Sequence, residues 1–106
     1  MLPKTNRLNL TKERFIRGDA QVSERYFKLV VKKGMAGGPK VGFIVSSKVG
    51  KAVVRNKVRR TLSESVQRNL LSISKDNHLI FIAFPQASSA KKDEIEISVK
   101  KALSKI

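Results

Sequence analysis

The chain has 106 residues, 41% of them hydrophobic, and carries 23 lysines and arginines against 8 acids, a net charge of +15. This length predicts a single domain, 1–106, and the hydrophobic content is high enough for a core, which excludes a disordered basic tail. So large a charge favours polyanionic partners: RNA, DNA or an anionic membrane. The absence of cysteine excludes a disulfide framework and a thiolate metal site.

A membrane is the weakest of these partners. The longest apolar run, 79–84, is too short to cross a bilayer, and residues 1–7 show no apolar segment typical of a secretory signal. The single histidine, His78, excludes a histidine metal cluster, and the acids form no paired-carboxylate motif. We therefore expect a cytoplasmic protein without a tightly bound cofactor or metal and without catalytic side chains.

The N-terminal half predicts a short helix and two strands. Thr11 fits the N-cap of a helix over 11–17. Alternation over 25–33 predicts a strand, and the glycine-rich turn 34–39 before a second strand, 41–48, predicts a hairpin. The residues expected to face the core are Phe27, Leu29, Val31, Val41, Phe43 and Val45. The residues expected on the opposite face are Tyr26, Lys28, Val30, Lys32, Gly42, Ile44, Ser46 and Lys48.

The C-terminal half predicts two helices around a strand. A helix over 53–71 and a strand over 78–84, apolar on both faces, are followed by a last helix capped by Ser88 or Ser89. The apolar stripe of the first of these helices is Val54, Val58, Leu62, Val66 and Leu70, and that of the last is Ile95, Val99, Ala102, Leu103 and Ile106. Asp93 and Glu94 suit the first turn of the last helix. The fold class is therefore α/β, a two-layer α+β sandwich with a small mixed sheet and the order α-β-β-α-β-α.

The start of the long helix is the strongest indication of function. Residues 52–60 contain four cations and no acid, which favours nucleic acid over an ordinary solvated face. Spacing predicts two charged surfaces, one beside the apolar stripe and one facing outward. The first holds Arg55, Arg59 and Ser63, and the second holds Lys57, Arg60, Glu64 and Arg68.

A second indication is the predicted exposed sheet face. Tyr26 and Lys28 would share a surface with Ile44, Ser46 and Lys48, where bases stack on the ring and lysines neutralise phosphates. Phe15 could close one side of this groove. The alternative is that Tyr26 and Phe15 only pack against neighbours, and the residues themselves leave both interpretations open.

Residues 41–60, VGFIVSSKVGKAVVRNKVRR, resemble the protein subunit of bacterial ribonuclease P. That family shows a glycine-valine strand, a Ser-Lys turn and then Gly-x-Ala-Val-x-Arg-Asn-Arg/Lys-x-Lys/Arg-Arg. Similarity to the family extends to residues 6–8, to Phe15, to Arg25 with Phe27, to 79–83 and to 87–88. The sequence departs from the family at Lys57, Ser63 and Phe84, where arginine is commoner.

The resemblance implies a left-handed β-α-β crossover through the basic helix. It also implies that a catalytic RNA cleaves the 5′ leader from precursor tRNA with Mg²⁺, while the protein binds both RNAs and needs no protein partner. The RNA-binding residues implied are Arg55, Asn56, Lys57, Arg59 and Arg60, with Lys51 and Arg68 assigned to the same surface. The leader groove implied is Phe15, Lys28, Ser46 and Lys48, which Tyr26 joins through the alternation.

Two other functions remain open from the residues alone. A structural RNA-binding protein, such as a ribosomal protein, would share the small size and basic composition. A DNA-binding module would place the helix 53–71 in the major groove, although no helix-turn-helix partner is visible.

Overall fold

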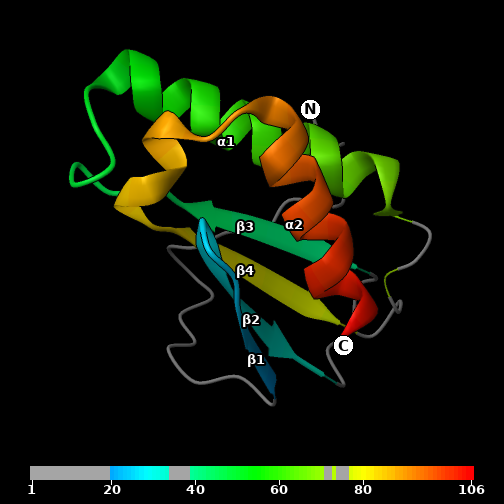
Figure 1. The fold of residues 1–106 in the computed structure, drawn as a ribbon. Helices are drawn as coiled ribbons and strands as arrows, with labels where there is room; N and C mark the ends of the chain where they lie inside the picture. Colours follow the sequence, from blue (N-terminus) through cyan, green and yellow to red (C-terminus); the bar gives the residue numbers. More distant parts are fainter. Residues whose placement is uncertain (1–19, 34–38, 71–72, 74–76) are drawn as a thin grey trace.

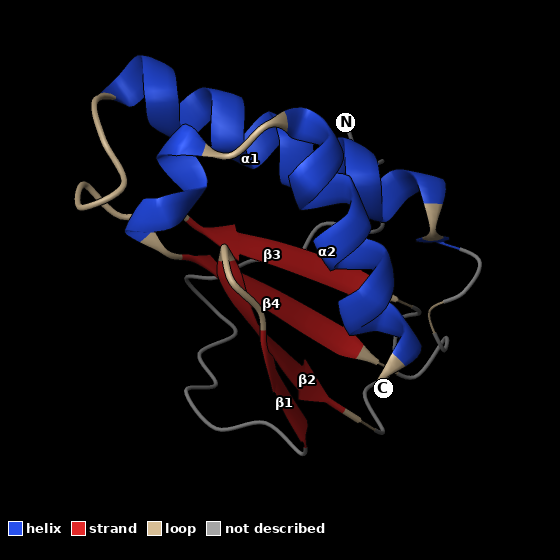
Figure 2. Ribbon diagram, viewed as in Figure 1, coloured by secondary structure: helices blue, strands red, loops and turns tan. Residues whose placement is uncertain are grey.

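The computed structural model describes residues 20–33, 39–70, 73 and 77–106. Two helices cover one face of a four-stranded mixed sheet (Figures 1 and 2), which confirms the predicted two-layer α+β class. The elements are β1 (Ala20–Ser23), β2 (Phe27–Lys32), β3 (Lys40–Ile44), α1 (Ala52–Arg68), β4 (His78–Ala83), the 3-10 helix η3 (Pro85–Ser89) and α2 (Lys92–Ser104). The helix expected over 11–17 lies outside the described residues.

The predicted hairpin is wrong. The strand order is β1-β2-β4-β3, so β4 separates β2 from β3. β4 runs antiparallel to β2 and parallel to β3. Its sequence, HLIFIA, is apolar on both faces, which suits a central strand, as predicted. The short β1, which the sequence did not predict, pairs antiparallel with β2. β3, α1 and β4 form a β-α-β crossover whose left hand stays a prediction from the family resemblance.

The core lies between the sheet and the helices. Phe81, in β4, stacks against Phe43 with ring centroids 5.7 Å apart and meets Phe27 at 5.2 Å. All but one of the residues predicted to face the core are buried; Phe43 is half-buried but packs against it. The predicted alternation of the strands is therefore correct within their observed bounds.

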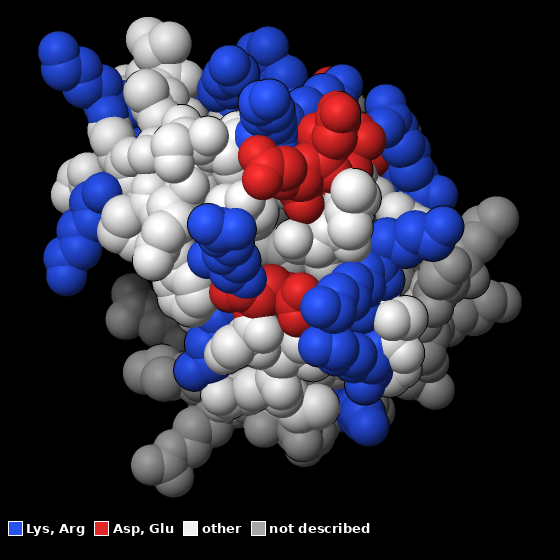
Figure 3. Space-filling model, in the orientation of Figure 1, with Lys and Arg blue, Asp and Glu red and all other residues white. Residues whose placement is uncertain are grey.

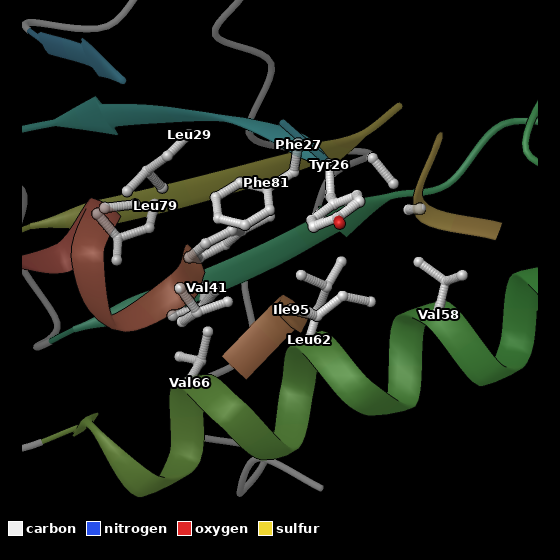
Figure 4. Close-up of a cluster of buried hydrophobic side chains, with 14 of the residues drawn as sticks. Tyr26, Phe27, Leu29, Val41, Val58, Leu62, Val66, Leu79, Phe81 and Ile95 are labelled. Atoms are coloured by element: carbon white, nitrogen blue, oxygen red, sulfur yellow. The ribbon is translucent and has the colours of Figure 1, made fainter. Parts of the chain in front are cut away.

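The apolar ridge of α1 packs on this sheet face. Val58, Leu62 and Val66 are buried and point from the helix towards the strands (Figure 4), while Val54 and Leu70 are partly buried beside them. Burial of such side chains stabilises a fold by about 1.5–3 kcal/mol each. The predicted ridge is confirmed, and it fixes which side of α1 is left for charged residues.

The turn before α1 differs from the prediction. β3 ends at Ile44 rather than Lys48, and the Val49 amide donates to the Ser46 carbonyl at 3.1 Å. Gly50 follows with φ 155°, where a Cβ would lie 3.0 Å from Cγ1 of Val54. Any other residue would be strained there and would press on the first turn of α1.

The start of α2 also differs. Ser88 and Ser89 belong to η3, where their hydroxyls donate to the carbonyls of Pro85 and Gln86, so neither caps α2. Instead, the Glu94 carboxylate accepts a hydrogen bond from the Lys91 amide at 3.0 Å. The Glu94 side chain thus satisfies a free backbone amide at the start of α2. The two serine hydroxyls are not available for this role, because each donates to the carbonyl three residues before it. The buried stripe Ile95, Val99, Ala102 and Leu103 is as predicted, with Ile106 packed against it.

Candidate nucleic-acid interface

The first two turns of α1 concentrate positive charge. The helix begins after Lys51, and its first turn holds no acid. Arg55 and Arg59 are half-buried on one flank, whereas Lys57 and Arg60 are exposed. Cations near a helix N-terminus oppose the helix dipole by about 0.3–1 kcal/mol each. This arrangement raises the energy of the free protein and favours an anionic partner.

Two side chains of the Arg-Asn motif are arranged by their neighbours. Asn56 accepts a hydrogen bond from Nη1 of Arg59 at 3.0 Å, which holds that guanidinium on the helix surface. The Nε of Arg55 is buried without a hydrogen-bond partner among the described residues. This atom is shielded from solvent, so it is not itself a contact point for a ligand, but the planar guanidinium groups of Arg55 and Arg59 match the geometry of phosphate. A phosphate oxygen is therefore the ligand that best suits this flank.

The far end of α1 serves a different purpose. Arg68 forms an ion pair with Glu96 of α2, and Glu64 pairs with Lys92 at 3.5 Å. Arg68 lies about 25 Å along the helix from Lys51. The second charged surface predicted for α1 exists, but its C-terminal part forms ion pairs with α2. The structure therefore does not bring Arg68 together with the other residues predicted to bind RNA.

The outer face of the sheet, opposite the helices, carries a row of three side chains. Register places Lys28 beside Ile82 and Ile82 beside Ile44, across β2, β4 and β3. Ile44 is 41% exposed, and Lys28 is half-buried. Two residues along the same face, Val30 and Ile80 form a small buried cluster, and Ile82 packs against it. A lysine beside exposed apolar surface suits a base and its phosphate.

Ser46 and Lys48 are exposed, but they lie in the turn between β3 and α1 rather than on the strand. They extend the row of Ile44 towards the start of the basic helix. The alternation could not place them because it assumed a longer strand. Phe15, the remaining aromatic predicted for this groove, lies outside the described residues.

Tyr26 does not share the exposed face, contrary to the prediction. It is 8% exposed, packs in the helix-side core, and donates from its hydroxyl to the Glu94 carboxylate at 2.7 Å. Tyr26 precedes β2, so the two-residue alternation does not extend to it. The hydrogen bond to Glu94 raises the pKa of Tyr26. The Lys91 amide and then the Tyr26 hydroxyl lower the pKa of Glu94.

Neither a metal site nor a membrane-spanning helix is present in the described part of the chain. No group of three or more His, Asp or Glu side chains could hold a metal ion there. No helix in that part is long and apolar enough to cross a membrane.

Comparison with known proteins gives the family. A model of the ribonuclease P family matches residues 2–106. The chain belongs to this family. The ribonuclease P protein component of Citrifermentans bemidjiense is 40% identical over 81 residues, which cover 74% of this chain and 70% of that protein. The RNase P protein from Staphylococcus aureus superposes with a TM-score of 0.76 at 25% identity, covering 98% of this chain and 91% of that chain.

Some relatives are much longer than the matched part. The ribonuclease P protein component of Thermus brockianus is 48% identical over 66 residues, so this chain spans 39% of that protein. Membership of the ribonuclease P family agrees with the resemblance seen in residues 41–60. It disfavours the two alternatives, a ribosomal protein and a DNA-binding module. The residues matching the family's basic motif lie on the first three turns of α1.

The Tyr26–Glu94 contact predicts a pH-dependent stability. Folding lowers the pKa of Glu94 from its ordinary 4.5. The stabilisation that Glu94 adds to the free energy of unfolding is therefore complete above that pH and is lost as the pH falls through the lower folded-state pKa. We expect the unfolding free energies of the wild-type chain and Glu94→Gln to differ at neutral pH and to converge in acid. Urea unfolding across this range measures the difference. Asp93→Asn, which removes a neighbouring acid without this contact, is the control, and a difference for Glu94→Gln that is constant with pH contradicts the prediction.

Proposed function

We propose that this chain is the protein subunit of ribonuclease P, acting in the cytoplasm to help remove the 5′ leader of precursor tRNA. Membership of the family over residues 2–106 supports this function. The observation that carries it is the basic start of α1. Arg55 and Arg59 lie on one flank of this helix, and its first turn lacks an acid. The outer sheet face supplies a second surface for single-stranded RNA.

We assign the bond chemistry to the RNA subunit. Its Mg²⁺ ions would activate water and stabilise the leaving oxygen of one phosphodiester. The chain itself would contribute binding energy, with α1 on the catalytic RNA and the row of Lys28, Ile82 and Ile44 on the leader. The mature tRNA has no leader, so contacts to the leader would favour precursor over product.

Cleavage of precursor tRNA by a bacterial ribonuclease P RNA tests this function. At low Mg²⁺, where the RNA alone works poorly, we expect the protein to restore cleavage at the mature 5′ end. The measurement is the rate of leader release with and without the protein. If the protein binds the RNA from its own source but leaves the rate unchanged, the function is wrong and a structural RNA-binding role remains.

The flank of α1 predicts a salt-dependent contact. Replacing Arg55 and Arg59 by alanine should weaken binding to the catalytic RNA and reduce the slope of log K against log salt by about 2, since each phosphate contact contributes about 0.9. Fluorescence titration over a series of salt concentrations measures both quantities. Lys100→Ala with Lys101→Ala removes equal charge from exposed positions of α2. Identical slopes for the two double variants would exclude the docking role.

The outer sheet face predicts discrimination between substrates. Lys28→Gln removes the cation beside Ile82, and we expect the holoenzyme to bind precursor tRNA several-fold more weakly, at about 1 kcal/mol for one contact, with mature tRNA unaffected. Equilibrium binding to the two tRNAs measures the ratio, and Lys101→Gln is the control. Equal losses for both tRNAs would place Lys28 outside a leader site.

A further inference from the structure

A hollow of about 340 Å³ lies where the start of α1 meets η3 and the start of α2. It shares Lys57 with the basic motif, but it lies on the other side of α1 from Arg55 and Arg59. Arg55 and Lys57 lie two residues apart, which is about 200° around a helix. The residues that line it are Val54, Lys57, Val58, Thr61, Ala87, Ser88, Ala90, Lys91, Lys92 and Ile95.

The hollow combines an apolar floor with a cationic rim. Val58, Ala87 and Ile95 are buried beneath it, while Lys57 and Lys91 are exposed. No acid lines it. Two other hollows on the described surface each include two acids, one beside Arg68 and one beside Tyr26. In Figure 3 the acids gather over α2, and none shows at the upper left, over the start of α1.

Two hydroxyls give the hollow a polar preference. Thr61 donates its hydroxyl hydrogen to the Lys57 carbonyl at 3.0 Å, and Ser88 donates to the Pro85 carbonyl at 2.8 Å. Both hydrogens are therefore used within the protein, and the oxygens retain acceptor lone pairs. A flat, largely apolar group that carries an amino donor and a neighbouring negative charge matches this lining.

We propose that this hollow binds one unpaired nucleobase of the RNA subunit, with the lysines on its flanking phosphates. The inference rests on the proposed function and adds a base-binding site to it. Unpaired bases in RNA are available to apolar and polar protein surfaces once they leave the stack. An RNA strand held here and at Arg55 would cross the basic start of α1, contacting it on both sides.

Titration of the full chain with adenosine 5′-monophosphate tests the site directly. Adenine supplies the amino donor, and ribose 5-phosphate is the matched ligand without a base. We expect adenosine 5′-monophosphate to shift the NMR methyl signals of Val54, Val58 and Ile95 to saturation, and ribose 5-phosphate to leave them unchanged. The same shifts with both ligands, or no shift of these methyls, would overturn the proposal.

A filled hollow gives a second test. Ala90→Leu adds bulk at a half-buried lining position with extended backbone, φ −74° and ψ 143°, which any residue adopts. We expect it to weaken binding to the ribonuclease P RNA about fivefold or more, the low end of one base contact, without changing the salt slope. Ser104→Leu, at the exposed end of α2, is the control.

Different results would contradict the proposed function and the proposed base site. If the wild-type chain does not bind the catalytic RNA, the proposed function is wrong. If it binds and Ala90→Leu binds equally well, only the base site is wrong. Should Ala90→Leu prove unfolded by circular dichroism, the nucleotide titration of the wild-type chain decides the question by itself.

Discussion

The contact between the apolar ridge of α1 and the sheet sets the direction of every cation on that helix. Successive helix residues are rotated by about 100°. Burial of Val58, Leu62 and Val66 therefore fixes the direction in which each side chain between them leaves the helix. Arg55 and Arg59 then lie on one flank, and Lys57 faces the opposite side. Rotation by one residue would bury an arginine and expose a valine, at a cost of several kcal/mol. The proposed RNA surface would thus be stabilised by the same packing that stabilises the core.

The parallel pairing of β3 with β4 ties this helix to the outer sheet face. β3 ends at Ile44, and the short turn over 45–51, with its glycine at 50, leads directly into α1. The row that contains Lys28 and Ile44 therefore continues along the chain into the basic motif. Since β4 sits between β2 and β3, a lysine from one strand and an isoleucine from another face the same side. In the proposed function, one extended RNA would run from the outer sheet face to the start of α1.

Sequence periodicity correctly predicted the features that depend on a single helix or strand. The ridge of α1, the stripe of α2 and the double-sided burial of β4 follow from local spacing and are all present. Strand pairing depends on partners distant in sequence, so the alternation of 25–33 and 41–48 could not reveal that β4 lies between them. Tyr26 was misplaced for a similar reason, because its partner, Glu94, is 68 residues away. Sequence could identify the basic motif and place Arg55 beside the apolar stripe, but it could not show that the Nε of Arg55 is buried without a partner among the described residues.

The charge of the chain is distributed unevenly over the described residues. Three of the five acids there belong to α2, and the other two, Glu24 and Glu64, form ion pairs with Lys105 and Lys92 at its ends. The α2 side is thereby close to neutral, whereas the start of α1 holds its cations against the helix dipole without acids. Mutual repulsion there disfavours the free folded state. A polyanion that binds only the folded chain removes this repulsion, so the proposed RNA binding would be coupled to folding stability through the same few side chains.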